Sequence, residues 1–160
     1  MRMSEGVEWG LHCCLVLAWL DDLAPLPVGR LAEVFDLPPE YLKKQLQPLA
    51  KAGILVSERG ARGGYRLGRD PEAITLMDVV TAIEGGTDPF QCTEIRQRGA
   101  GQTGAPAEFA HPCGISMAMR KAELAWRREL ASQTLAKLIA NTPDTAERRT
   151  RRFIERTATA

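Results

Sequence analysis

Apolar residues recur every three or four positions along the first third of the chain, which is the spacing of helices that bury one face. The pattern predicts a first helix that ends at the Asp21-Asp22 pair. A short second helix is expected over residues 28–35. A third should run from Glu40 to Gly53, since glycine suits the left-handed residue that follows many helices. Two short helices joined by a tight turn make a helix-turn-helix.

The period of the pattern changes after the third helix. Residues 54–57 and 65–67 indicate two short strands, and the glycine-rich stretch ERGARGG between them is typical of a hairpin turn. A hairpin directly after a helix-turn-helix is the element order of a winged helix. The alternative for this stretch is an ordinary basic surface hairpin, which the preceding helix-turn-helix makes much weaker.

The middle of the chain combines a well-marked helix with an aperiodic segment. Thr75 and Asp78 form a capping-box pattern, which predicts a helix that ends at the Gly85-Gly86 pair. Periodicity then stops, and the following stretch is rich in Gly, Thr, Pro and Gln. A loop of such length is usually functional or disordered.

A long helix is expected next, reaching about Asn141. Its apolar stripe cannot be buried on so small a body, so we assign it to a dimer interface. The stripe consists of Ile115, Met119, Ala122, Trp126 and Leu130. The predicted fold class is therefore mainly α with a small β-hairpin wing, that is, a winged helix-turn-helix plus a long dimerisation helix. Its segments are a winged-helix DNA-binding domain over 1–86, a loop over 87–114, the dimerisation helix over 115–142, and a basic tail over 143–160, helical or frayed, which we expect to be solvated.

Composition excludes some classes of protein. The chain of 160 residues is the size of one domain, and it contains no run of 18 apolar residues and no signal-peptide pattern. We therefore expect no membrane contact and a cytoplasmic location. Without a secretory signal, the four cysteines favour metal binding, redox chemistry or packing over a disulfide framework.

The net charge of +1 says nothing about nucleic acid, but the distribution of charge does. The helix-turn-helix, over about residues 28–51, presents polar side chains opposite its apolar stripe. Those expected to face double-stranded promoter DNA are Glu40, Lys43, Lys44 and Gln47. Arg59 and Arg62 stand in the hairpin turn, where we expect them to reach phosphates or the minor groove.

The stretch EWGLHCC in the first helix carries candidate metal ligands. Glu8 and His12 are four residues apart, so they leave the same face of a helix, as two ligands of one site could. The alternative is a solvated Glu8 and a half-buried His12. Cys13 and Cys14 point elsewhere and are expected in the core. A zinc-dependent enzyme using Glu8 and His12 is a weak hypothesis, because no HExxH, phosphate-loop or nucleophile motif is present.

Three stretches of the sequence carry a family resemblance. MRMS opens the chain, LPPEYLKKQLQPLAKAGILVSERGARGGYRLGRDPEAITLMDVVTAIEG forms its middle, and a cysteine-bearing loop precedes a long helix. Together these stretches resemble the Rrf2 family of bacterial regulators, most specifically in RG-x-x-GGY-x-L followed by P-x-x-ITL-x-DV. The resemblance implies a winged-helix homodimer that binds palindromic promoter DNA. Several members of the family use an iron-sulfur cluster held by the loop.

The loop departs from the cluster-binding pattern of the family, because it has two cysteines where those relatives usually have three. In the nitrite-sensitive branch a carboxylate near the start of the first helix ligates the cluster of the partner subunit, and Glu8 occupies the similar position. The resemblance therefore implies a 2Fe-2S cluster held by Cys92 and Cys113 of one subunit and by Glu8 and His12 of the other. Mixed thiolate, imidazole and carboxylate ligation suits iron. His111, close to Cys113, is the rival ligand.

These observations lead to one expected function and one close alternative. We expect a sequence-specific transcriptional regulator, and not an enzyme. It should act as a repressor whose operator binding follows the redox state of the cluster. Trp9, beside Glu8, is large enough to move when Glu8 shifts, although a packing role is its simpler interpretation. The alternative is a thiol-disulfide switch that uses Cys92 and Cys113 without a cluster.

Overall fold

The computed structural model describes residues 3–86 and 89–158, so the ends of the predicted segments at 1–2, 87–88 and 159–160 lie outside the described residues. The chain forms two compact units. One combines the residues up to Gly86 with those from Leu130 onwards, and the other extends from Thr87 to Glu129.

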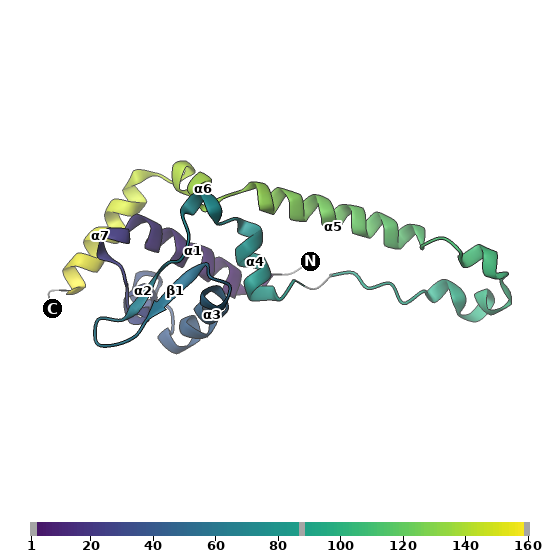
Figure 1. Cartoon of the computed structure of the whole chain (residues 1–160), viewed down its shortest axis with the longest axis horizontal. Coiled ribbons are helices and arrows are strands. Elements are labelled where there is room, and N and C mark those ends of the chain that lie inside the picture. The colour runs from purple at the N-terminus through teal and green to yellow at the C-terminus, as the bar shows by residue number, and fades with distance from the viewer. Residues whose placement is uncertain (1–2, 87–88, 159–160) are drawn as a thin grey trace. The chain divides into compact units, whose positions relative to one another are not determined.

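The first unit is the predicted winged helix, extended by two further helices (Figure 1). Its elements are α1 (Glu5–Trp19), α2 (Val28–Phe35), α3 (Pro39–Lys51), β1 (Leu55–Glu58), β2 (Gly64–Leu67), α4 (Leu76–Glu84), α6 (Leu135–Asn141) and α7 (Asp144–Ala158). The helix-turn-helix and the hairpin follow one another as the sequence predicts. The mainly α fold with a β-hairpin wing is thus confirmed.

The core of this unit is built around α1. Cys13 and Cys14 are fully buried there, as expected, among leucines and valines from the surrounding helices. Burial raises the pKa of both thiols, that of Cys14 to about 12, so both remain protonated and serve as small packing groups. The apolar face of α3 is buried as predicted, through Leu42, Leu46 and Leu49.

The wing is fixed to the helix-turn-helix by its second strand. β1 and β2 pair antiparallel, with Leu55 opposite Leu67. Tyr65 on β2 also exchanges backbone hydrogen bonds with Leu26, at 2.9 and 2.8 Å, just before α2 begins. A Cβ at position 64 would collide with the backbone of Leu26, so glycine is required at Gly64 for this close approach.

Both ends of α4 are capped as the sequence predicts. The Thr75 hydroxyl accepts a hydrogen bond from the Asp78 backbone at 3.1 Å, and the Asp78 carboxylate accepts one from the Thr75 backbone at 2.9 Å. Gly85 ends the helix with a φ of 82°. These caps fix where α4 begins and where it ends.

The prediction of a single long helix over 115–142 is wrong in one respect, because the structure has two helices there. α5 covers Gly114–Ser132 and α6 begins only at Leu135. The Gln133 carbonyl accepts a hydrogen bond from the Leu76 backbone at 2.9 Å, and the Leu135 backbone donates to Ile74 at 2.8 Å. This pairing with a distant segment holds the chain extended at the break and outweighs the local helical pattern.

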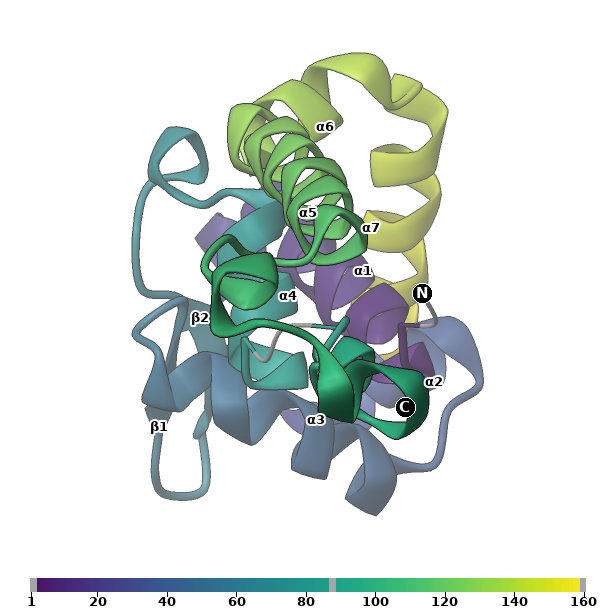
Figure 2. The same cartoon turned by 90° about the vertical axis from the view of Figure 1, so that its right-hand side faces the viewer.

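The basic tail is also more ordered than the solvated end that the sequence suggests. It forms α7, which lies beside α1 and α2 in both views (Figures 1 and 2). Ile154 and Thr150 are buried, and Arg151 makes two hydrogen bonds with Asp22, at 2.8 and 3.0 Å. Arg151 also donates to the Trp19 carbonyl at 2.8 Å. α7 is therefore a docked part of the first unit.

The second unit consists of a loop with three short 3₁₀ turns, followed by most of α5. The turns are Ile95–Gln97, Gly99–Thr103 and Pro106–Phe109. None of the α5 residues is buried in the described chain, and its exposed apolar side chains include Ile115, Met117, Met119 and Leu124. Among the described residues, no helix combines the length and the apolar character needed to span a membrane.

Candidate functional site

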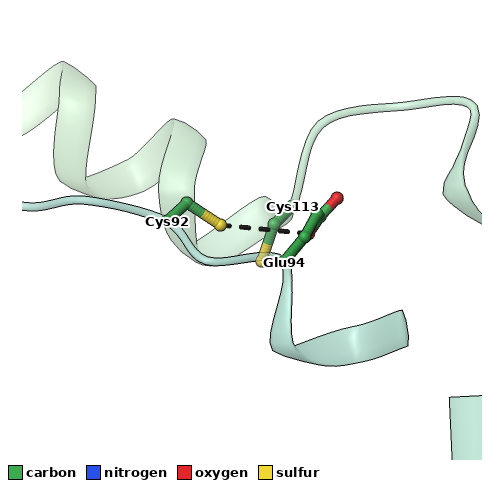
Figure 3. Close-up of side chains that lie close together, drawn as sticks. All are labelled: Cys92, Glu94 and Cys113. Atoms are coloured by element: carbon green, nitrogen blue, oxygen red, sulfur yellow. Dashed lines mark hydrogen bonds between the residues drawn. The ribbon is translucent and has the colours of Figure 1, made fainter. Parts of the chain in front are cut away.

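The two loop cysteines are brought together within the second unit. The sulfur atoms of Cys92 and Cys113 and a carboxylate oxygen of Glu94 all lie within 4.8 Å of one another (Figure 3). Both thiols are free, Cys92 exposed and Cys113 half-buried. The Cys92 thiol donates to Glu94 Oε1 at a sulfur-to-oxygen distance of 3.8 Å. Two sulfurs and one oxygen at such separations are a donor set for a transition metal.

Cys113 stands directly before the first turn of α5, whose unpaired backbone N–H groups favour negative charge. Hydrogen bonds from the backbone of Ser116 and of Ile115 to the sulfur lower the pKa of Cys113, and the positive charge of Arg96 adds to the effect. The start of the helix therefore favours the thiolate, which is the form that binds metals and attacks disulfides.

Arg96 connects the two sides of this loop. Its guanidinium makes two hydrogen bonds with the Glu94 carboxylate, at 3.0 and 2.6 Å, which lower the pKa of Glu94. The same group donates to the His111 carbonyl at 3.0 Å and lies 5.7 Å from the centre of the Phe109 ring. One side chain thus contacts the segment after Cys92 and the segment before Cys113.

Glu94 and Arg96 were not identified from the sequence, which directed attention to His111 instead. Within the part of the chain that the structure describes, the metal-ligand group contains Cys92, Glu94 and Cys113 and not the His111 imidazole. His111 contributes its backbone carbonyl. The signal available in the sequence was the spacing C-x-E-x-R, which places a carboxylate and a guanidinium close to Cys92.

Glu8 and His12 occupy one face of α1, as their spacing predicts. Both side chains are exposed and line a groove of about 440 Å³. The other residues of this groove are Met3, Ser4, Glu5, Val7 and Leu11. The pair belongs to the first unit and the two cysteines to the second, so their assignment to one metal site stays a prediction.

Two aromatic contacts join this face of α1 to the helix-turn-helix. The half-buried Trp9 meets Tyr41 of α3 edge to face, with ring centroids 5.3 Å apart. The His12 ring lies 5.4 Å from that of Phe35, the last residue of α2. A movement of Trp9 or His12 would therefore displace side chains of both helices of the helix-turn-helix.

The candidate DNA-contacting residues all lie on the surface. Glu40, Lys43, Lys44 and Gln47 are exposed on α3, and Arg59 and Arg62 are exposed in the turn between β1 and β2. Opposite them on α3, the leucines are fully buried. An ion pair of 3.1 Å between Arg66 and Glu58 links the two strands beneath the turn. These side chains can reach a bound nucleic acid, and their individual roles stay predictions.

Comparison with known proteins places the chain in a family. Residues 3–141 match the Rrf2 family, described as iron-dependent transcriptional regulators. The chain is 35% identical over 94 residues to the HTH-type transcriptional regulator CymR of Bacillus subtilis, an alignment that covers 59% of this chain and 68% of CymR. It is 31% identical over 142 residues to YffB of Lactococcus lactis, covering 89% of each.

Solved structures agree with this placement. The structure of CymR, described as the global cysteine regulator of B. subtilis, matches with a TM-score of 0.66 and 29% identity, over 89% of this chain and 99% of that one. The oxidized form of Staphylococcus aureus CymR matches with a TM-score of 0.58 and 27% identity, over 87% and 96%. The match over most of the chain, together with the winged helix and its exposed basic wing, shows that this protein belongs to the Rrf2 family and is a DNA-binding transcriptional regulator, not an enzyme.

Proposed function

We propose that this regulator senses redox state through a 2Fe-2S cluster, held by Cys92 and Cys113 of one subunit and by Glu8 and His12 of the partner subunit. In this proposal it acts as a homodimeric repressor whose oxidised form binds the operator more tightly. The observation that carries the proposal is the convergence of the two loop thiols, 21 positions apart in the sequence, into one group at the start of α5.

The residues present fit such a group. Iron-sulfur sites need deprotonated thiols, and the backbone N–H groups of α5 favour that form at Cys113. Thiolates bound to one metal at about 2.3 Å are separated by roughly 3.8 Å, which lies within the 4.8 Å that encloses the donor atoms. The carboxylate and imidazole required to complete four ligands are exposed on α1 and can be reached by a second subunit.

The contacts of α1 suggest how the site acts on DNA binding. When bound, the cluster supplies a one-electron change that makes its site more negative by one charge. The added charge would repel Glu8, and His12 would either accept a proton or move away. Because Trp9 and His12 touch Tyr41 and Phe35, either response displaces side chains on α3 and α2. A coupling of about 1–3 kcal/mol, equivalent to a roughly 5- to 150-fold change in affinity, is sufficient for a switch.

Dimerisation has its own support in the second unit. Exposed apolar side chains on α5, among them Ile115, Met119 and Leu124, form a surface that a second copy of α5 would cover. A twofold dimer would present two α3 helices to half-sites about one helical turn apart. We therefore expect a palindromic operator.

The test is anaerobic purification followed by a visible spectrum. The proposal expects a coloured protein with charge-transfer bands, and Glu8→Ala or His12→Ala should abolish or alter them. Cys13→Ala is the matched control, since that thiol is buried in the core and should leave the spectrum unchanged. Operator affinity should differ between the oxidised and dithionite-reduced protein. A colourless protein after anaerobic purification would refute the cluster.

The thiol-disulfide switch is the second candidate, and the same convergence favours it. Cys92 and Cys113 are close, one is exposed, and the pKa of Cys113 is lowered, which suits disulfide exchange. A relative of this chain, S. aureus CymR, has been solved in an oxidized form. A colourless protein that loses two titratable thiols on oxidation, with a change in operator affinity, would support this candidate.

A further inference from the structure

We propose that Arg96 is the positioning residue of the cysteine loop, and that the Arg96–Glu94 pair sets the reduction potential of the group held by Cys92 and Cys113. The first part concerns the loop itself and stands without a cofactor. The second part rests on the proposed cluster.

The positioning role follows from where the contacts of Arg96 lead. Glu94 is two residues after Cys92 and is held in the left-handed region at a φ of 50°. Arg96 donates two hydrogen bonds to that carboxylate. It donates a third to the carbonyl of His111, two residues before Cys113. The guanidinium therefore closes a loop whose two ends carry the thiols.

The surroundings of Arg96 support the same role. Its guanidinium lies over the ring of Phe109, which belongs to the returning segment of the loop. A Cβ at Gly101 would collide with the Arg96 carbonyl, so the intervening turn packs directly on this backbone. Three parts of the loop thus meet at Arg96, by hydrogen bonds, by ring contact and by close backbone approach.

The electrostatic role follows from the charges beside the sulfurs. Glu94 and Arg96 form an ion pair with a closest distance of 2.6 Å, and the Glu94 carboxylate lies on the side of Cys92. A cation near a metal centre favours its more negative, reduced form, whereas an anion opposes it. The wild-type pair balances these effects, so removal of either partner should shift the potential, each in its own direction.

The first experiment measures the midpoint potential of the cluster-loaded dimer by anaerobic spectroelectrochemical titration. Arg96→Gln should lower the potential and Glu94→Gln should raise it, each by at least a threefold change in the reduction equilibrium, equivalent to about 28 mV for one electron. Gln at position 94 keeps an oxygen that can accept from Arg96, and Arg96→Lys keeps the charge and should stay close to wild type.

Arg98→Gln is the matched control, because it removes the same charge from an exposed side chain two positions away. Its potential should equal that of the wild type. Shifts of the same sign in Arg96→Gln and Glu94→Gln, or no shift in either, would overturn the electrostatic role, since a purely structural disturbance does not depend on the sign of the charge removed.

The second experiment uses the metal-free protein and measures how fast Cys92 and Cys113 form a disulfide with diamide. The two thiols lose two protons and two electrons, and the N=N bond of diamide takes them up to become a hydrazine. Arg96→Ala should slow this reaction at least fivefold relative to Arg98→Ala, and Arg96→Lys should recover part of the rate. Equal rates in wild type and Arg96→Ala would overturn the positioning role. If no protein holds a cluster, the proposed function fails while the disulfide rate still decides the role of Arg96.

Discussion

The contact between Trp9 and Tyr41 allows the proposed link between α1 and α3 to be tested quantitatively. The ring centroids lie 5.3 Å apart at an interplanar angle of 74°, an edge-to-face arrangement that contributes about 0.5–1.5 kcal/mol beyond burial. Because Tyr41 is 49% exposed, the lower part of that range, about 0.5–1 kcal/mol, applies. If this contact is made in only one redox state, Tyr41→Leu should reduce the ratio of reduced to oxidised operator dissociation constants roughly 2- to 5-fold.

The assay is fluorescence anisotropy of a labelled operator duplex, titrated anaerobically with oxidised and with dithionite-reduced protein. The ratio of the two constants cancels any direct contact between Tyr41 and DNA that is the same in both states. Tyr41→Phe keeps the ring and should keep the wild-type ratio. A ratio that is unchanged in Tyr41→Leu, with the cluster spectrum intact, would refute the link through Trp9.

Three further predictions concern the DNA surface, the dimer and the docked C-terminal helix. Arg59→Ala should weaken operator binding by about 1–3 kcal/mol if this side chain reads a base edge, and an unchanged affinity would remove the wing from the interface. Met119→Asp places a charge on the exposed stripe of α5 and should convert a homodimer to a monomer in light scattering at micromolar concentration; a wild-type monomer would contradict the α5 interface. Arg151 lowers the pKa of Asp22 in the folded protein, so the stability from this pair is complete above the ordinary value of 3.8 and is lost as pH falls through the lower folded value. The difference in unfolding free energy between wild type and Arg151→Gln should therefore shrink in urea titrations below that pH, and a constant difference would exclude the ion pair as its cause.

The parts of the fold that sequence analysis predicted are those governed by neighbours along the chain. The leucine spacing of α3, the capping box of α4 and the glycine that ends α3 are local signals, and each has the predicted structure. The helix break at Gln133 depends on pairing with residues near position 75, and no local pattern announces it. The docking of α7 likewise depends on a contact between Arg151 and Asp22, which lie 129 positions apart.

The candidate site was predictable to a similar degree. The family resemblance directed attention to Cys92 and Cys113, and helical spacing placed Glu8 and His12 on one face. Glu94 was missed because its role depends on a left-handed backbone conformation that aims the carboxylate at the thiols. Arg96 was missed because its significance comes from a carbonyl fifteen positions away, and no local pattern indicates which donor side chain bonds to a distant carbonyl.

The capped helix α4 has a mechanical consequence for the attachment of the cysteine loop. The chain leaves the DNA-binding unit after Gly86, beyond one end of α4, and has rejoined it before the Thr75–Thr134 bridge at the other end. The nine residues of α4 separate these two anchor points by about 14 Å. Because α4 is a regular helix, the segment between these two points can be lengthened, shortened or exchanged without changing the distance between them. The same DNA-binding unit can therefore carry loops with different chemical groups.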